Sequence, residues 1–277
     1  MIVCAHGYSG NARDFDYLAA RLASEARVLC IDFPGRGDSE WLKSSMEYNF
    51  GQFVADARTL IAQLEVPSVD WIGTSMGGLL GMMLASQASS PVRRLVMNDV
   101  GAFLPMDALR EISRGLEAPR SFVSLDAVEA HLRRTRAQWG PIDDAEWKAM
   151  ARHNSRPLRH GSRELRLHFD PRIAQVARPM PLTPGLFFWD AWYRVRCPAL
   201  LLRGERSRVL PANVAATMLD IRPDARLVEI PGCGHVPSLM AEDQVALVRN
   251  FLQDDGVQMQ EHGRDAPPKR AFPARAA

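Results

Sequence analysis

The chain has 277 residues, of which 47% are hydrophobic and 24% are charged, and its formal net charge at pH 7 is only +2. This composition excludes a mainly disordered polymer, and so small a net charge gives no field that would attract nucleic acid. No stretch approaches the roughly 18 consecutive apolar residues of a membrane-spanning helix, and the first residues lack the pattern of a signal peptide. The four cysteines have neither C-x-x-C nor metal-ligand spacing. We therefore expect no metal, no membrane partner and a reducing, cytoplasmic location.

Short apolar runs typical of β-strands alternate with helical patterns along the chain. The expected strands cover residues 2–5, 27–31, 69–73, 95–97, 199–202 and 227–230. Apolar residues spaced three and four apart predict helices at 14–22 and 53–64, and a further apolar helix is expected at 77–85. Strands that alternate with helices predict an α/β fold, with a mostly parallel sheet covered by helices on both faces.

The strand pattern disappears between about residues 101 and 196. Helical patterns, such as the one at 125–139, alternate there with loops rich in proline and arginine. We interpret 101–196 as a mostly helical cap inserted into an α/β core formed by residues 1–100 and 197–254. Residues 255–277 are polar, rich in alanine and proline, and without apolar periodicity, so we expect them to form a disordered tail.

A G-x-S-x-G pattern, Gly73-Thr-Ser75-Met-Gly77, lies between an expected strand and an expected helix. Small residues on both sides of Ser75 allow the chain to reverse sharply, which would hold the serine in a strained conformation clear of the backbone, as a nucleophile requires. A simple tight turn would have a similar sequence. If Ser75 is a nucleophile, the expected oxyanion donors are the backbone N–H groups of Met76, at the helix N-terminus, and of Tyr8, after the first strand.

A serine hydroxyl near pH 7 is a weak nucleophile and needs a neighbouring base. Of the seven histidines, only His235 directly follows a late strand, in the glycine-rich stretch PGCGHVP. His235 is therefore the expected base, against the alternative of a structural loop histidine. His6 is expected to be structural, and His262 falls in the expected tail. The four histidines of the cap are expected on solvated faces: His131, His153, His160 and His168.

Four motifs occur in order, each at the end of an expected strand: HGYSGNARDFD, DFPGRGDS, GTSMGG and PGCGH. Together they resemble the α/β-hydrolase family, in particular its capped, serine-nucleophile members of the esterase and C–C-hydrolase kind. The resemblance covers about residues 1–254 and implies Ser75 as nucleophile, His235 as base, and an acid between them in the chain. The family usually has an antiparallel pair of strands before the one that ends in His-Gly. Here that pair is missing, so we expect an exposed edge of the sheet.

The acid of the triad is the unsettled member. The family usually carries it in a Gly-x-x-Asp turn, but here the corresponding position holds Ser207. Some relatives carry the acid at the end of the preceding strand, where this chain has Asp99. Asp99 is the favoured candidate, and Glu205 is the alternative because its longer side chain could reach from the turn. A water-supported dyad and a degenerate site remain open.

The cap carries aromatic and basic residues that could contact a substrate. The expected apolar lining includes Trp139, Phe188, Trp189 and Trp192, which could equally form the core of the cap. A basic run is expected to form a solvated helix face, with contact to an anionic substrate as the alternative: Arg152, His153, Arg156, Arg159, His160, Arg163 and Arg166.

These features predict a serine hydrolase that acts on a carboxylic ester, lactone or thioester through an acyl-enzyme. The expected partner is a small acyl substrate, with no cofactor. Two alternatives remain: a C–C bond hydrolase that uses the same Ser75 and His235, and a non-catalytic binding protein on the same fold.

Overall fold

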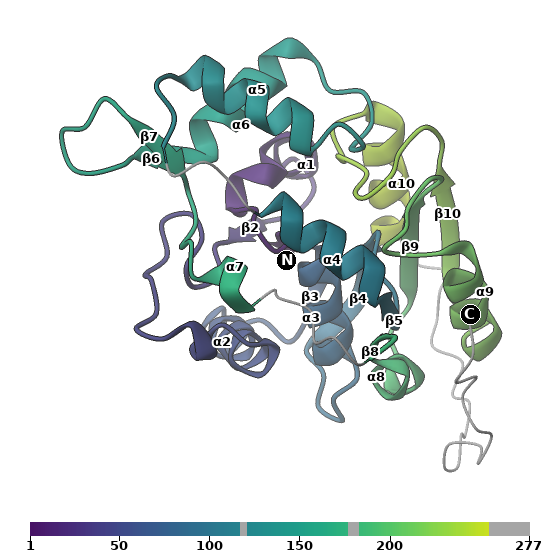
Figure 1. Ribbon diagram of the computed structural model, residues 1–277. Coiled ribbons are helices and arrows are strands. Elements are labelled where there is room, and N and C mark those ends of the chain that lie inside the picture. Colours follow the sequence, from purple (N-terminus) through teal and green to yellow (C-terminus); the bar gives the residue numbers. More distant parts are fainter. Residues whose placement is uncertain (117–120, 177–182, 255–277) are drawn as a thin grey trace.

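A computed structural model describes residues 1–116, 121–176 and 183–254 of the chain. Its centre is a six-stranded sheet in the order β10-β9-β4-β3-β1-β2, in which every pairing is parallel (Figure 1). The strands are β1 (Ile2–Ala5), β2 (Val28–Ile31), β3 (Val69–Thr74), β4 (Val92–Asn98), β9 (Ala199–Gly204) and β10 (Arg226–Ile230). The predicted parallel α/β sheet, with all six of its strands, is confirmed. The half-buried strand β2 forms one edge.

Helices cover both faces of this sheet. They are α1 (Asp16–Leu22), α2 (Phe50–Gln63), α3 (Met76–Ala85), α9 (Ala212–Ile221) and α10 (Glu242–Gln253). Alternate residues of a strand point to opposite faces, and so Val3 of β1 joins the core under α2, α3 and α9. Its neighbour Cys4 joins the core under α1 and α10.

Strand β1 lies between the edge strand β2 and β3, and this order brings the loops after β1 and β3 together. From β1 the chain passes outward to β2 and then returns to β3 on the other side of β1. In such doubly wound sheets, ligands bind at the carboxyl ends of the strands where the direction of winding reverses. Ala5 of β1 is in register with Gly73 of β3. The loop after β1 and the turn after β3 therefore lie side by side at this edge.

Residues 101–196 run between β4 and β9. Their helices are α4 (Met106–Gly115), α5 (Leu125–Thr135), α6 (Asp144–His153), α7 (Ile173–Val176) and α8 (Trp189–Arg194). We expected no strands here, but the segment contains two antiparallel pairs, β5 (Phe103–Pro105) with β8 (Gly185–Phe187) and β6 (Ser155–Pro157) with β7 (Leu165–Leu167). Each of these strands has three residues, which is too short for an alternating pattern to be recognised in the sequence.

Helices α5 and α6 pack together above α1 (Figure 1). They have a small core of their own, to which Val128 and Leu132 of α5 and Trp147 and Met150 of α6 contribute. The two short 3-10 helices, Ala12–Phe15 and Ser45–Glu47, belong to loops between the sheet strands. The expected disordered tail lies outside the described residues. No helix among the described residues is long and apolar enough to cross a membrane.

Candidate active site

Ser75 is the single residue between β3, which ends at Thr74, and α3, which begins at Met76. Its backbone has φ 50° and ψ −113°, a conformation that costs a non-glycine residue on the order of 1–3 kcal/mol. Neighbouring contacts hold it there: its N–H donates to the carbonyl of Asn98 at 2.9 Å, and its own carbonyl accepts from Gly78 at 2.9 Å. The strain that the motif predicts is therefore present at this serine.

The glycines around Ser75 are required by close packing. A Cβ on Gly73 would collide with the backbone of Gly77, and a Cβ on Gly77 would collide with the carbonyl group of Ala5 in β1. A Cβ on Gly7 would lie 3.7 Å from the Cβ of Ser75. The loop after β1 therefore approaches the serine closely, which puts the Tyr8 backbone next to the turn.

His235 and Asp99 come together from loops 136 residues apart. Nδ1 of His235 lies 2.7 Å from Oδ2 of Asp99, whose side chain is fully buried, while the imidazole is 21% exposed. Asp99 directly follows β4 and has φ 57°, and its N–H donates to the carbonyl of Leu202 at 2.8 Å. The carboxylate is thus held between β4 and β9, beneath the imidazole.

The second carboxylate oxygen of Asp99 also has a donor. Oδ1 accepts the backbone N–H of Gly204 at 2.9 Å, and Oδ2 accepts the hydroxyl of Ser207 at 2.6 Å. Ser207 occupies the position at which the family resemblance places the acid, and its hydroxyl contacts the candidate acid Asp99. The alternative acid, Glu205, is exposed, and its carboxylate accepts the backbone N–H of Gly232 at 2.8 Å.

Hydrogen bonds from both sides fix the loop that carries His235. On the core side, Nδ2 of Asn98 donates to the carbonyl of Pro237 at 2.9 Å. On the other side, the N–H of Gly234 donates to the carbonyl of Gln138 at 2.7 Å, and the N–H of Ser238 donates to the carbonyl of Trp139 at 3.0 Å. The position of the imidazole thus depends on the segment after α5 as well as on the sheet.

A cavity of about 390 Å³ brings these groups together. This volume is typical of a site for a small molecule. Ser75, His235 and Tyr8 all line it, whereas Met76 lies directly behind Ser75 at the start of α3. Its wall on the side of residues 101–196 comes from α4 and from the end of α5: Ala108, Glu111, Ile112, Leu116 and Arg134 to Trp139.

His6 lines the same cavity, but both of its ring nitrogens form hydrogen bonds to the backbone. Its ring Nε2 accepts the backbone N–H of Phe33 at 3.1 Å, and so Nδ1 carries the proton and donates to the carbonyl of Gly7 at 2.7 Å. Burial lowers the pKa of His6 to about 4. His6 is therefore neutral near pH 7 and shapes the loop that leads to Tyr8.

Of the four aromatic residues proposed for the substrate pocket, only Trp139 lines the cavity within the described part of the chain. Trp192 is completely buried in the core, where its indole N–H donates to the carbonyl of Met218 at 2.9 Å. Phe188 packs against Phe50, with ring centroids 6.0 Å apart. Trp189 also packs against the main core.

The basic run at 152–166 does not line the cavity either. Two of its guanidinium groups, those of Arg156 and Arg166, lie over the ring of Trp41. The arginines that line the cavity are Arg134, Arg136 and Arg208. The sequence analysis proposed none of the three as a cavity residue. Only Arg208 could have been suspected from the sequence, because it lies in the turn after Gly204, at the carboxyl end of a strand.

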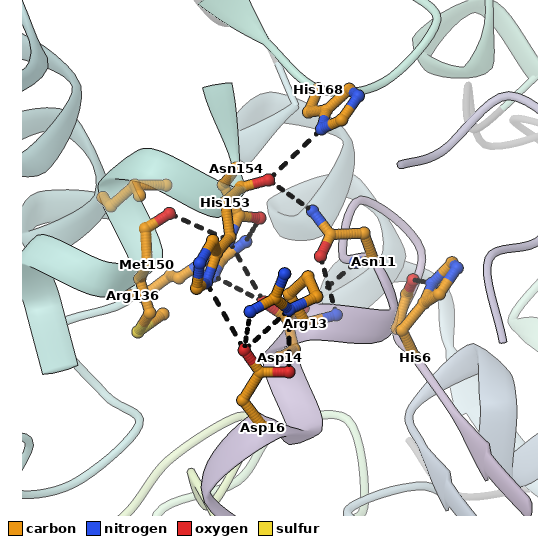
Figure 2. Close-up of polar contacts among 12 residues, drawn as sticks. His6, Asn11, Arg13, Asp14, Asp16, Arg136, Met150, His153, Asn154 and His168 are labelled. Atoms are coloured by element: carbon orange, nitrogen blue, oxygen red, sulfur yellow. Dashed lines mark hydrogen bonds and ion pairs between the residues drawn. The ribbon is translucent and has the colours of Figure 1, made fainter. Parts of the chain in front are cut away.

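A polar network joins the cavity wall to the start of the core (Figure 2). Oδ1 of Asp14 accepts from Nη1 of Arg136 at 3.3 Å and from Nδ2 of Asn154 at 3.2 Å. Arg136 also donates to Oδ1 of Asn154 at 2.9 Å, and Nδ2 of Asn11 donates to the carbonyl of His153 at 3.0 Å.

Among the described residues, no group of three or more histidine, cysteine or acidic side chains is arranged to hold a metal ion.

Known proteins match this chain along most of its length. It is 37% identical to a 3-hydroxybutyrate-oligomer hydrolase of Cupriavidus necator, over 91% of this chain and 88% of the relative. It is 27% identical to a 2-(acetamidomethylene)succinate hydrolase of Mesorhizobium japonicum, over 89% of this chain and 86% of the relative. Its fold is similar to the crystal structure of an α/β hydrolase from Novosphingobium aromaticivorans, with a TM-score of 0.81, 33% identity, and coverage of 91% of this chain and 88% of that one. The family model for the alpha/beta hydrolase family matches residues 2–248, and the chain therefore belongs to this family of hydrolases.

Proposed function

We propose that this hydrolase is a serine esterase that cleaves short esters of aliphatic hydroxy acids, with oligomers of 3-hydroxybutyrate as the leading candidates. The observation that carries the proposal is the 2.7 Å hydrogen bond between His235 and Asp99, beside a cavity that also exposes the strained Ser75. The similarity to the Cupriavidus oligomer hydrolase supports the choice of substrate.

In the proposed mechanism, Asp99 accepts a hydrogen bond from the Nδ1–H of His235, which keeps this proton on Nδ1 and leaves Nε2 as the basic nitrogen. Nε2 takes the hydroxyl proton of Ser75 as its Oγ attacks the ester carbonyl. The backbone N–H groups of Tyr8 and Met76 stabilise the resulting oxyanion. His235 then gives the proton to the departing alkoxide, and an acyl-enzyme remains on Ser75.

Water completes the cycle. His235 removes a proton from a water molecule, whose oxygen attacks the acyl carbonyl; the second tetrahedral intermediate collapses, and Ser75 recovers its proton. Each turnover therefore consumes one water molecule and releases one carboxylic acid and one alcohol. For an oligomer of 3-hydroxybutyrate, both products are hydroxy acids.

The non-catalytic alternative rests on the missing aspartate at the usual position, which holds Ser207, and on the missing first pair of strands. A buried carboxylate is in contact with His235 from the other strand end, which favours the catalytic interpretation. The C–C hydrolase alternative would use the same Ser75 and His235, so the substrate test must separate it from esterase activity.

The test is steady-state hydrolysis of the 3-hydroxybutyrate dimer and trimer, and of p-nitrophenyl acetate, butyrate and octanoate. We expect turnover of the oligomers and the short esters, with loss of at least 10³-fold in kcat for Ser75→Ala. Labelling by a fluorophosphonate probe in wild type, and none in Ser75→Ala, would identify the nucleophile directly. Folded wild type that turns over a vinylogous diketone but no ester would move the protein to the C–C hydrolases, and failure to label Ser75 would favour the binding protein.

A further inference from the structure

The charged side chains that line the cavity are unequally paired. Among the residues that the structure describes, three arginines and two carboxylates, those of Asp14 and Glu111, line the cavity. Arg136 forms an ion pair with Asp14 at 3.3 Å, and both side chains are largely buried. These two charges therefore compensate each other inside the wall.

Arg208 is also paired. Its guanidinium contacts Asp107 at 2.6 Å and Glu111 at 3.1 Å, both on α4. The cation at this part of the wall thus has two acidic partners, which leave it little capacity to attract a further anion.

Arg134 differs from both. Within the described ranges, its guanidinium has no carboxylate partner, and its one hydrogen-bond contact is to Nδ1 of His131 at 3.1 Å. Arginine can only donate, and so this ring nitrogen must accept, which requires a neutral imidazole. The pKa of His131 is lowered, first by burial and then by the positive charges of Arg134 and Arg136. Among the described residues, Arg134 therefore has neither a carboxylate partner nor a negatively charged hydrogen-bond partner.

We infer that Arg134 binds the carboxylate of an anionic ester substrate, which for a 3-hydroxybutyrate oligomer is its free carboxyl terminus. The inference rests on the proposed function and adds the substrate feature that the enzyme selects. Arg134 comes from the end of α5, and Ser75 comes from the sheet, yet both line one cavity. A guanidinium binds a carboxylate through two parallel hydrogen bonds, which fix its orientation as well as its position. Arg134 therefore sets which ester bond of a short oligomer lies at Ser75.

This arrangement predicts a preference for short, soluble oligomers with a free carboxylate. An oligomer whose terminus is capped as a neutral amide offers the same ester bond but gives Arg134 nothing to neutralise. Wild type should therefore hydrolyse the dimer acid with a kcat/KM about tenfold or more above that of the dimer amide, since hydrogen bonds to charged groups contribute at this level.

The test compares Arg134→Gln with Arg133→Gln. Arg133 is the adjacent residue, but its guanidinium pairs with Glu129 and Asp144, and it does not line the cavity. For each protein, kcat/KM is measured on the dimer acid and on the dimer amide by chromatography of the released 3-hydroxybutyrate. We expect Arg134→Gln to bring the ratio of the two values close to one and to act mainly through KM. Arg134→Lys should keep part of the preference, and Arg133→Gln should keep all of it.

A second measurement does not depend on turnover. The dimer acid is titrated calorimetrically into Ser75→Ala and into Ser75→Ala/Arg134→Gln, with the dimer amide as the neutral probe. The inference is supported if the double variant binds the dimer acid more weakly than Ser75→Ala does, while the two variants bind the dimer amide equally. If wild type hydrolyses acid and amide equally, or if Arg134→Gln keeps the wild-type ratio, the role of Arg134 is wrong and the esterase proposal stands. If wild type hydrolyses neither dimer nor any p-nitrophenyl ester, the proposed function fails, and this inference fails with it.

Discussion

Ser207 and Asp99 are joined by a hydrogen bond of 2.6 Å from Oγ to Oδ2, the same carboxylate oxygen that lies 2.7 Å from Nδ1 of His235. The Ser207 oxygen in turn accepts the backbone N–H groups of Val209 and Leu210, at 3.2 and 3.1 Å. One buried hydroxyl therefore ties the turn after β9 to the carboxylate that orients the candidate base.

Replacement of Ser207 by alanine should weaken both functions of this hydroxyl. Asp99 would lose a donor and two backbone N–H groups would lose their acceptor, so we expect the free energy of unfolding to fall by about 2 kcal/mol. We also expect kcat to fall about tenfold, because the carboxylate beneath His235 is less firmly held. Urea denaturation and steady-state hydrolysis of p-nitrophenyl butyrate measure the two effects.

Ser86→Ala is the matched control for Ser207→Ala. The Ser86 hydroxyl donates to the carbonyl of Met83 at 2.8 Å at the end of α3 and does not contact the site. Its removal should cost less than about 1 kcal/mol and leave kcat unchanged. An unchanged kcat in Ser207→Ala as well would limit Ser207 to a structural role.

The two candidate acids predict opposite results. Asp99→Asn should lower kcat by about 10³-fold or more, since the amide leaves the imidazole in the wrong tautomer. Glu205→Gln keeps an oxygen that can accept the Gly232 N–H and should stay within about twofold of wild type. Hydrolysis of p-nitrophenyl butyrate by the two variants compares them directly, and loss of activity in Glu205→Gln alone would move the acid to the turn after Gly204.

Most of the sheet could be predicted because its signals are local. Each strand of the sheet has four to seven residues and contains a short apolar run, and the turn at Ser75 has glycines at fixed spacing. Asp99 could be proposed as the acid because of the family resemblance, since some relatives carry the acid at the end of this strand, and Asp99 directly follows β4.

The rest of the site depends on contacts between distant segments. The hydrogen bond from Ser207 to Asp99 joins residues that are 108 positions apart in the sequence, and the contact between Arg136 and Asp14 joins residues that are 122 positions apart. The sequence left the aromatic residues open between pocket and core, because a tryptophan suits both, and only the structure shows that Trp192 is buried in the core. Likewise, the basic run at 152–166 could not be distinguished from the cavity arginines, because a single sequence does not show which face of a helix meets a cavity.

His6 makes the stability of the fold depend on pH. Its pKa in the folded protein is about 4, as a result of burial, against about 6.5 for a free histidine. The unfolded chain thus binds a proton at this residue at pH values where the folded chain does not. This contribution to stability is complete above about pH 6.5 and falls as the pH drops toward 4, by up to about 3 kcal/mol.

The titration of His6 can be followed directly by NMR through its ring Cε1–H signal. We expect a midpoint near 4 in the folded protein, together with a loss of unfolding free energy between pH 6.5 and 4 that is smaller in His6→Asn. A midpoint near 6.5 would mean that the ring nitrogens are not committed to Phe33 and Gly7 in solution.

The ion pair between Arg136 and Asp14 should contribute strongly to the attachment of α5 and α6 to the core. Both side chains are about one-tenth exposed, and removal of one partner from a buried pair typically costs about 3–5 kcal/mol because the other charge is left without compensation. We therefore expect Arg136→Gln to lower the free energy of unfolding by about 3 kcal/mol. Asp14→Asn/Arg136→Gln should recover part of that loss, since neither charge then remains buried.

Urea denaturation of wild type, the two single variants and the double variant completes this cycle. Arg133→Gln is the control, because its ion pairs with Glu129 of α5 and Asp144 of α6 are more exposed, and such pairs contribute about 0–1 kcal/mol. Asp14 also accepts the backbone N–H of Asn11 at 3.3 Å, three residues after Tyr8. We therefore expect Asp14→Asn to lower kcat for p-nitrophenyl butyrate as well, by loosening the loop that carries the proposed oxyanion donor. Additive effects of the two single variants would mean that the pair is not coupled in solution, and that the attachment depends on the apolar contacts between the helices and the core.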